Sequence, residues 1–256
     1  MILKNFLKIA SICLISFLFI FWEFFKAHCQ KTGISVKASK TRKYFLPIND
    51  PPITDKGIQQ AKEVGKRLQD EQIDYIFCSP FVRCLQTATA IVRELKTNAK
   101  LKLFVEPGFC ETFCVTQFPP GCLTAKELVS NYELIDPEYE HFLKEFLPED
   151  DEYVCELRIR KTIESILEKY SGNILIISHG SPIAAIHTVL GRKYRYVGYC
   201  GISKFVVTPT SESSPTNREN KNGPNDIHSK YHFKCSLAGD YSHLSDHTNL
   251  HTRELL

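Results

Sequence analysis

The chain has 256 residues, of which 43% are hydrophobic and 24% charged, a composition that excludes a disordered chain and fits one α/β domain or at most two small ones. A net charge of +3 is too small to indicate a nucleic-acid partner. No basic stripe with interleaved aromatic residues is present, so we expect no nucleic-acid binding. Ten cysteines lie at irregular spacings without paired CxxC motifs. We therefore expect reduced thiols, with neither a zinc site nor a disulfide framework.

The N-terminal region begins with Lys4 and Lys8, followed by an uncharged apolar run from Ile9 to Trp22. The run is about 14 residues long, which is shorter than the ~20 residues that span a bilayer. Basic residues concentrated after it favour keeping that side cytoplasmic. Three alternatives stay open: a short anchor with the domain in the cytoplasm, a cleaved signal of a secreted protein, or an apolar stretch packed on the domain. We assign 1–30 to a hydrophobic leader, 31–49 to a basic linker and 50–256 to the folded domain.

The domain alternates helical and strand patterns in chain order. A helix capped by Thr54 runs to about residue 69, and a strand over 73–77 leads into a helix begun by Ser79 and Pro80. The further elements are a strand over 101–105, an irregular insertion over 107–150 with one or two short helices, a helix over 155–170, a strand over 173–178 and a helix that starts at Ser181-Pro182 and stops at Gly191.

The apolar faces of three of these helices follow from residues spaced by three or four. They comprise Ile58, Ala61, Val64 and Leu68; Leu85, Ala88, Ile91, Val92 and Leu95; and Leu157, Ile159, Ile163, Ile166 and Leu167.

The C-terminal part contains two possible paired strands, 204–207 and 231–235, joined by a stretch rich in Pro, Ser and Asn. We expect residues 208–226 to form a disordered loop. The alternation of strands and helices predicts an α/β fold, a three-layer α–β–α sandwich around a mainly parallel sheet with a helical insertion.

Two strand ends run directly into helices that begin with Ser-Pro, and such helix starts favour anions, phosphate above all. Arg83 lies one turn inside the first of these helices, where its guanidinium can reach a phosphate; the alternative is a solvated surface arginine. His179 ends the most apolar strand, immediately before Gly180. Glu111 follows the strand at 101–105; a carboxyl there can donate a proton if its pKa is raised, although a surface glutamate is the simpler interpretation.

Four segments together resemble the histidine phosphatase superfamily, with its phosphoglycerate-mutase-like fold. They are Asp50-Pro51-Pro52-Ile53-Thr54-x-x-Gly57-x-x-Gln60-Ala61, Ser79-Pro80-x-x-Arg83-x-x-Gln86-Thr87-Ala88, Glu106-Pro107-Gly108-Phe109-Cys110-Glu111 and Ser178-His179-Gly180. Their order and spacing agree over about residues 50–210. The segments at 50 and 106, with Ser242-His243-Leu244, look most like the phosphatase domains of the suppressor-of-T-cell-receptor-signalling group and of insect ecdysteroid-phosphate phosphatase.

The resemblance implies metal-free and cofactor-free hydrolysis of a phosphomonoester through a phosphohistidine. Arg83 would bind the phosphoryl group, His179 would bind it and stabilise the transition state, and Glu111 would protonate the leaving group. The substrate would be a phosphorylated small molecule or a phosphoprotein, chosen by the insertion at 107–150.

The chain departs from the family pattern in one respect, because no Arg-His-Gly occurs in it. His28 follows an apolar run, as the nucleophile should, but Ala27 and Cys29 replace the arginine and glycine; we interpret His28 as flanking a membrane or signal segment rather than as the nucleophile. The nucleophile is therefore unassigned. True loss of catalysis, a replaced first exon and a degraded motif at His28 are all compatible with the sequence.

Two functions follow. The chain is either an impaired phosphomonoesterase or a non-catalytic pseudo-phosphatase that binds a phosphorylated ligand or a partner protein. The oligomeric state is not indicated by the sequence.

Overall fold

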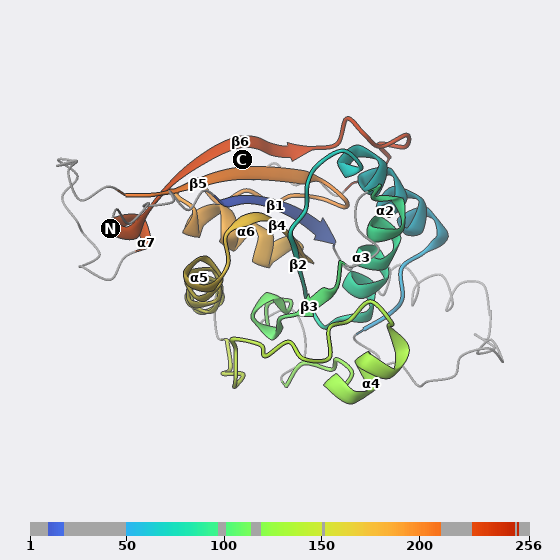
Figure 1. The fold of residues 1–256 in the computed structure, drawn as a ribbon, viewed down its shortest axis with the longest axis horizontal. Helices are drawn as coiled ribbons and strands as arrows, with labels where there is room; N and C mark the ends of the chain where they lie inside the picture. Colours follow the sequence, from blue (N-terminus) through green and yellow to red (C-terminus); the bar gives the residue numbers. More distant parts are fainter. Residues whose placement is uncertain are drawn as a thin grey trace, which may run out of the picture.

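The computed structural model describes residues 10–17, 50–96, 101–113, 119–149, 152–210, 227–248 and 250. Within these ranges the chain builds one six-stranded sheet in the order β3-β2-β4-β1-β5-β6, with helices on both faces (Figure 1). The predicted three-layer α/β fold is confirmed. His28, the 31–49 linker and residues 211–226 of the expected loop lie outside the described residues.

Apart from β1, the strands follow the predicted segments closely, and β1 to β4 run parallel. Their bounds are β1 Ala10–Phe17, β2 Tyr75–Cys78, β3 Leu103–Val105, β4 Gly172–His179, β5 Ile202–Pro209 and β6 Tyr231–Asp240. β4 pairs in parallel with both β1 and β2, and β2 also pairs in parallel with β3. β5 pairs antiparallel with both β1 and β6. The predicted strand pair is therefore β5 and β6, and β5 extends two residues into the stretch expected to be a disordered loop.

β1 lies inside the sheet, between β4 and β5 (Figure 1). Ala10 to Phe17 pairs residue by residue with Gly172 to His179, and Ile12 is fully buried among the residues under α5 and α6. The division between a leader over 1–30 and a domain from residue 50 does not hold for these eight residues. Their backbone groups are paired along both edges, which an apolar strand achieves only within a sheet.

The first face of the sheet is covered by α2 (Asp55–Leu68) and α3 (Val82–Glu94). The Thr54 hydroxyl accepts the backbone N–H of Gly57 at 3.1 Å and caps α2 as predicted. Ile58, however, is 37% exposed, so its place on the buried face is wrong. Gln60 is buried instead, on the same side of α2 as Ala61, Val64 and Leu68.

The helix α3 begins later than the Ser-Pro pair predicts, with Phe81 as its N-cap residue. Ser79 is two residues upstream, where its hydroxyl accepts the backbone N–H of Phe81 at 3.4 Å. Leu85, Ala88 and Ile91 are fully buried as expected, whereas Val92 and Leu95 are only partly buried.

The other face is covered by α5 (Glu152–Lys169) and α6 (Gly180–Val189). Ile159, Ile163 and Ile166 point into this core, but Leu157 is 39% exposed, contrary to the prediction. α6 begins at Gly180 with His179 as N-cap, so the Ser181-Pro182 pair lies within its first turn.

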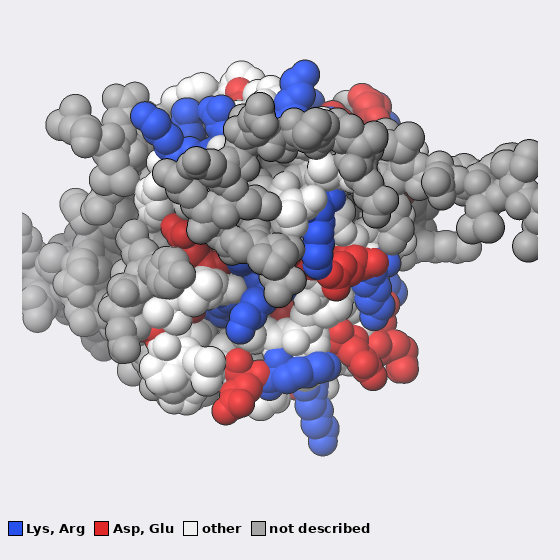
Figure 2. Space-filling view, turned by 90° about the vertical axis from the view of Figure 1, so that its left-hand side faces the viewer, with Lys and Arg blue, Asp and Glu red and all other residues white. Residues whose placement is uncertain are grey.

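The insertion contains two short helices, as predicted: the 3-10 turn η1 (Pro107–Phe109) and α4 (Ala125–Asn131). A further short helix, α7 (Ile227–Lys230), leads into β6. None of the helices among the described residues is long and apolar enough to cross a membrane. On the face shown in Figure 2, the described acidic and basic side chains are interspersed, in keeping with the small net charge.

Candidate phosphate-binding site

The site begins with His179, the last residue of β4, at the carboxyl end of the parallel strands. Ser79 follows the neighbouring strand β2, and its backbone N–H donates to Ile177 at 3.0 Å. The Ser79 hydroxyl and His179 Nε2 are 2.8 Å apart, within hydrogen-bond distance. Both side chains are fully buried, and the ring of Phe81 meets the imidazole edge-on at 5.1 Å. The two strand ends singled out in the sequence therefore converge.

Arg83 enters the same site from the first turn of α3. Its guanidinium lies over the Phe81 ring at 4.4 Å, and its side chain is 2% exposed. Nη1 lies 3.5 Å from Asp50 Oδ1, and Nη2 lies 3.9 Å from Glu111 Oε2. The interpretation of Arg83 as a solvated surface residue is thereby excluded.

Glu111 completes the cluster from the loop that follows η1. Its Oε2 lies 3.7 Å from His179 Nδ1, and the side chain is 2% exposed rather than on the surface. Burial raises the pKa of Glu111 to about 7, although Arg83 opposes the rise. A carboxyl with this pKa carries a proton in a large fraction of molecules near neutral pH, which suits a general acid.

The imidazole of His179 is neutral near pH 7. Burial lowers its pKa well below the ordinary value, and the charges of Arg83 and Arg158 lower it further. A neutral imidazole donates one hydrogen bond and accepts one. It can therefore orient a phosphoryl oxygen without adding a second full positive charge beside Arg83.

The loop that carries Glu111 is held by two buried charged residues. Glu106 accepts the backbone N–H of Gly108 at 2.8 Å and the Tyr139 hydroxyl at 2.8 Å. Arg158, from α5, pairs with Glu149 and donates to the Gly108 carbonyl at 2.7 Å. The loop is thus fixed from both sides, and Glu111 is held facing Arg83.

Asp50 is the site residue whose role the sequence did not reveal, although it stands in one of the motif segments. Its side chain is fully buried, and Oδ2 accepts the backbone N–H of Val82 at 2.8 Å. The segment is fixed beside α3 by Gln86, whose Oε1 accepts the backbone N–H of Ile53 at 2.8 Å. Cys84 also contacts the imidazole, with Sγ 3.6 Å from His179 Nε2. No local pattern marks either contact, because each joins α3 to a residue that lies far from it in the sequence.

The end of β1 lies beside His179, since Phe17 and His179 are partners in the parallel register. The family pattern places its Arg-His-Gly at the end of the first strand, and the sequence has none there.

The described residues contain no cluster of His, Cys, Asp or Glu that could hold a metal ion. The cysteines with described side chains are free thiols.

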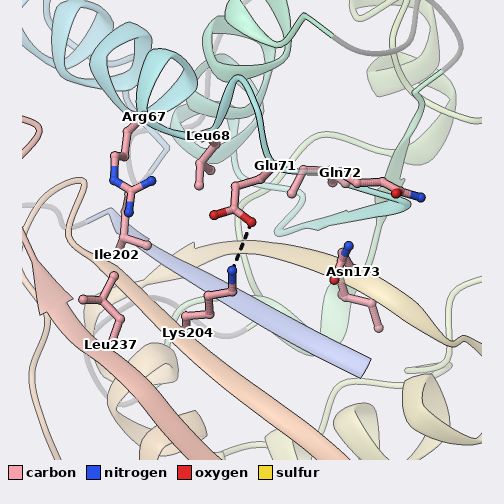
Figure 3. Close-up of a pocket in the computed structure, with 10 residues that line it drawn as sticks. Arg67, Leu68, Glu71, Gln72, Asn173, Ile202, Lys204 and Leu237 are labelled. Atoms are coloured by element: carbon pink, nitrogen blue, oxygen red, sulfur yellow. Dashed lines mark hydrogen bonds and ion pairs between the residues drawn. The ribbon is translucent and has the colours of Figure 1, made fainter. Parts of the chain in front are cut away.

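A separate pocket lies near the opposite ends of the strands, where β4 begins at Gly172 and Asn173 (Figure 3). Ile202 and Leu237 line it together with residues from the end of α2, and Lys204 donates to Glu71 at 3.0 Å across it. None of the predicted site residues lines it.

The fold and the buried arginine–histidine–glutamate cluster define a phosphoglycerate-mutase-like protein. The model of the histidine phosphatase superfamily (branch 1) matches residues 35–209, and the chain belongs to this family. The chain is 35% identical over 147 residues to the ecdysteroid-phosphate phosphatase of Drosophila melanogaster, covering 53% of this chain and 19% of that protein. It is 31% identical over 179 residues to the human ubiquitin-associated and SH3 domain-containing protein B, covering 61% of this chain and 28% of the relative. The chain thus spans less than a third of these two relatives.

Solved structures agree on the architecture. The ecdysone phosphate phosphatase of Bombyx mori, in complex with tungstate, has a TM-score of 0.57 at 21% identity over 82% of this chain and 97% of that one. A phosphoglycerate mutase of Bacillus anthracis has a TM-score of 0.51 at 16% identity over 93% of this chain and 95% of the other. These likenesses establish the fold, and the predicted family is confirmed.

Proposed function

We propose that this chain binds the phosphoryl group of phosphomonoesters at Arg83, His179 and Glu111 and hydrolyses it slowly, without a metal ion. One observation carries the proposal: Glu111 lies within 4 Å of both Arg83 and His179, and the three side chains, from three separate segments, form a buried cluster at the carboxyl ends of the strands. Guanidinium and imidazole groups held in this way match the oxygens of a phosphoryl group.

In the proposed reaction Arg83 neutralises the phosphoryl oxygens, and His179 donates a hydrogen bond that strengthens as charge develops. Glu111 transfers its proton to the ester oxygen as the phosphorus–oxygen bond breaks. Water supplies the new oxygen; one of its two protons stays with the phosphate product, and the other returns to Glu111 and restores the acid. The slow rate follows from the lack of Arg-His-Gly, since removing a nucleophile from a covalent hydrolase costs about 10⁶ in kcat.

The second candidate, a pseudo-phosphatase that only binds a phosphorylated small molecule or phosphoprotein, rests on that same missing motif. Placement of the domain in the cytoplasm, with or without membrane attachment, stays a prediction from the charges after residue 22.

The test measures p-nitrophenyl phosphate hydrolysis and, in parallel, calorimetric binding of inorganic phosphate by the wild type and the Arg83→Met, His179→Ala and Glu111→Gln variants. We expect turnover near background and phosphate binding that Arg83→Met abolishes. Robust turnover that His179→Ala removes would refute the impairment and establish a full enzyme. Absence of Arg83-dependent phosphate binding would refute the site itself.

A further inference from the structure

Asp50 presents its carboxylate to the N-terminus of α3 and to the guanidinium of Arg83. Its Oδ2 accepts the N–H of Val82, the first residue of α3, at 2.8 Å from 32 residues upstream. Its Oδ1 lies 3.5 Å from Arg83 Nη1. Phe81, the N-cap residue of α3, has no capping side chain, so Asp50 supplies the anion that a helix N-terminus favours.

The guanidinium of Arg83 is flanked by two carboxyl groups, since Glu111 Oε2 lies 3.9 Å from Nη2. All three side chains are buried, with exposures of 2% or less. When both carboxyls are ionised, their charge exceeds that of the one guanidinium between them. A phosphoryl group that carries one or two negative charges would then meet repulsion at low local dielectric.

We propose that Asp50 is a built-in competitor of the phosphoryl group, one that must lose its charge before Arg83 can take up a phosphate-like anion. The inference rests on the binding part of the proposed function. It makes Asp50 the residue that sets how strongly the site binds anions and how that affinity changes with pH.

The pH range follows from the surroundings of Asp50. Burial raises its pKa to about 6, against the opposing effects of the Val82 hydrogen bond and the Arg83 charge. Cys84 and Tyr132 also face Asp50, but burial raises the pKa of both thiol and phenol, so they stay neutral near pH 7. Cys122, whose contact with the Cys110 thiol lowers its pKa, is a further titratable group facing Asp50 among the described residues.

The expected effect is a ratio of affinities. If binding requires neutral Asp50 with a pKa of about 6, its ionisation weakens anion binding about 30-fold at pH 7.5 and about twofold at pH 6. The ratio of wild-type to D50N dissociation constants should therefore rise by about tenfold per pH unit above 6. The ionisation of phosphate cancels in this ratio because both proteins bind the same ligand. The ionisation of Glu111 cancels to first order because both proteins contain it.

The experiment titrates inorganic phosphate by calorimetry into wild type and D50N between pH 5.5 and 8. The amide oxygen of Asn can still accept the Val82 N–H, which separates the charge from the cap. Asp70→Asn removes an exposed carboxylate that pairs with Lys96 and serves as the matched control. Cys122→Ser removes the neighbouring thiol and tests whether it contributes to the pH dependence. We expect about 30-fold tighter binding by D50N at pH 7.5 and unchanged affinities for both controls.

A ratio of dissociation constants that stays near one, or that does not change with pH, would overturn the inference about Asp50. The proposed function would still stand in that case, provided that the wild type binds phosphate in an Arg83-dependent way. Loss of Arg83-dependent binding in both proteins would overturn the two together. Should D50N fail to fold, a second measurement decides the question: the number of protons taken up when sulfate binds to the Glu111→Gln variant. Sulfate is chosen because it does not titrate in this pH range. Uptake of about one proton per sulfate at pH 7.5 supports a neutralised Asp50, and no uptake contradicts it.

Discussion

Replacing Arg158 with methionine should destabilise the fold strongly, because Arg158 is the centre of a buried charged cluster behind the acid-bearing loop. It pairs with Glu149, donates to the carbonyls of Gly108 and Cys110 at 2.7 and 3.0 Å, and lies over the ring of Phe113 at 5.0 Å. Arg158 is 8% exposed and Glu149 7%. Removing one partner of such a pair leaves the other charge buried, at a cost of about 3–5 kcal/mol in the free energy of unfolding.

The double variant gives the sharper test. Adding Glu149→Gln to Arg158→Met removes the orphaned charge, so the double variant should be about 2 kcal/mol more stable than Arg158→Met alone. Urea unfolding followed by far-ultraviolet circular dichroism at pH 7.5 measures all four corners of the cycle. Lys96→Met, which breaks an exposed pair with Asp70, is the control and should cost less than about 1 kcal/mol. Strictly additive costs for Arg158 and Glu149 would refute the reasoning.

Three further predictions concern the same core. Glu106→Gln should cost about 2 kcal/mol in urea unfolding, because its fully buried carboxylate accepts the Tyr139 hydroxyl and backbone N–H groups. Gly108→Ala should cost about 1–3 kcal/mol, since the added Cβ would lie 2.1 Å from Thr162 Oγ1, and adding Thr162→Ala should recover part of that loss, because the Thr162 Cβ, 2.9 Å from the added atom, remains. Burial lowers the pKa of His187 to about 4, below its unfolded value of 6.5. The neutral imidazole therefore contributes fully to the free energy of unfolding above pH 6.5, and this contribution is lost as the pH falls from 6.5 through 4. The stability of the wild type relative to His187→Asn should fall by about 3 kcal/mol between pH 7 and pH 4 in thermal unfolding.

Each of these has a result that contradicts it. If Glu106→Gln leaves the free energy of unfolding unchanged, the charge of Glu106 contributes nothing to the stability of the loop. Equal losses for Gly108→Ala with and without Thr162→Ala would exclude the steric explanation. A stability difference for His187→Asn that does not change with pH would show that the imidazole is not kept neutral by burial.

Local patterns predicted much of the architecture, because short-range hydrogen bonds and periodicity are written in neighbouring residues. Thr54 caps α2 through a hydroxyl three residues from its partner, and the apolar run before His179 forms β4. The exposure of Ile58 and Leu157 was missed, since periodicity shows that a helix has an apolar face but not how much of it the next element covers. α3 starts at Val82 rather than at the Ser79-Pro80 pair, and the Ser79 hydroxyl contacts His179, 100 residues away, which no local pattern predicts.

The sequence by itself determined the family and the sheet with helices on both faces, and its resemblance to that family pointed to Arg83, Glu111 and His179, whose side chains the fold brings into one buried cluster. Only the tertiary structure decided that Ala10–Phe17 is a strand inside the sheet and that Asp50 faces Arg83. An apolar run of that length is compatible with a leader or a strand until β4 and β5 pair with its backbone. A carboxylate becomes part of an anion site only when packing removes it from water and brings a guanidinium beside it.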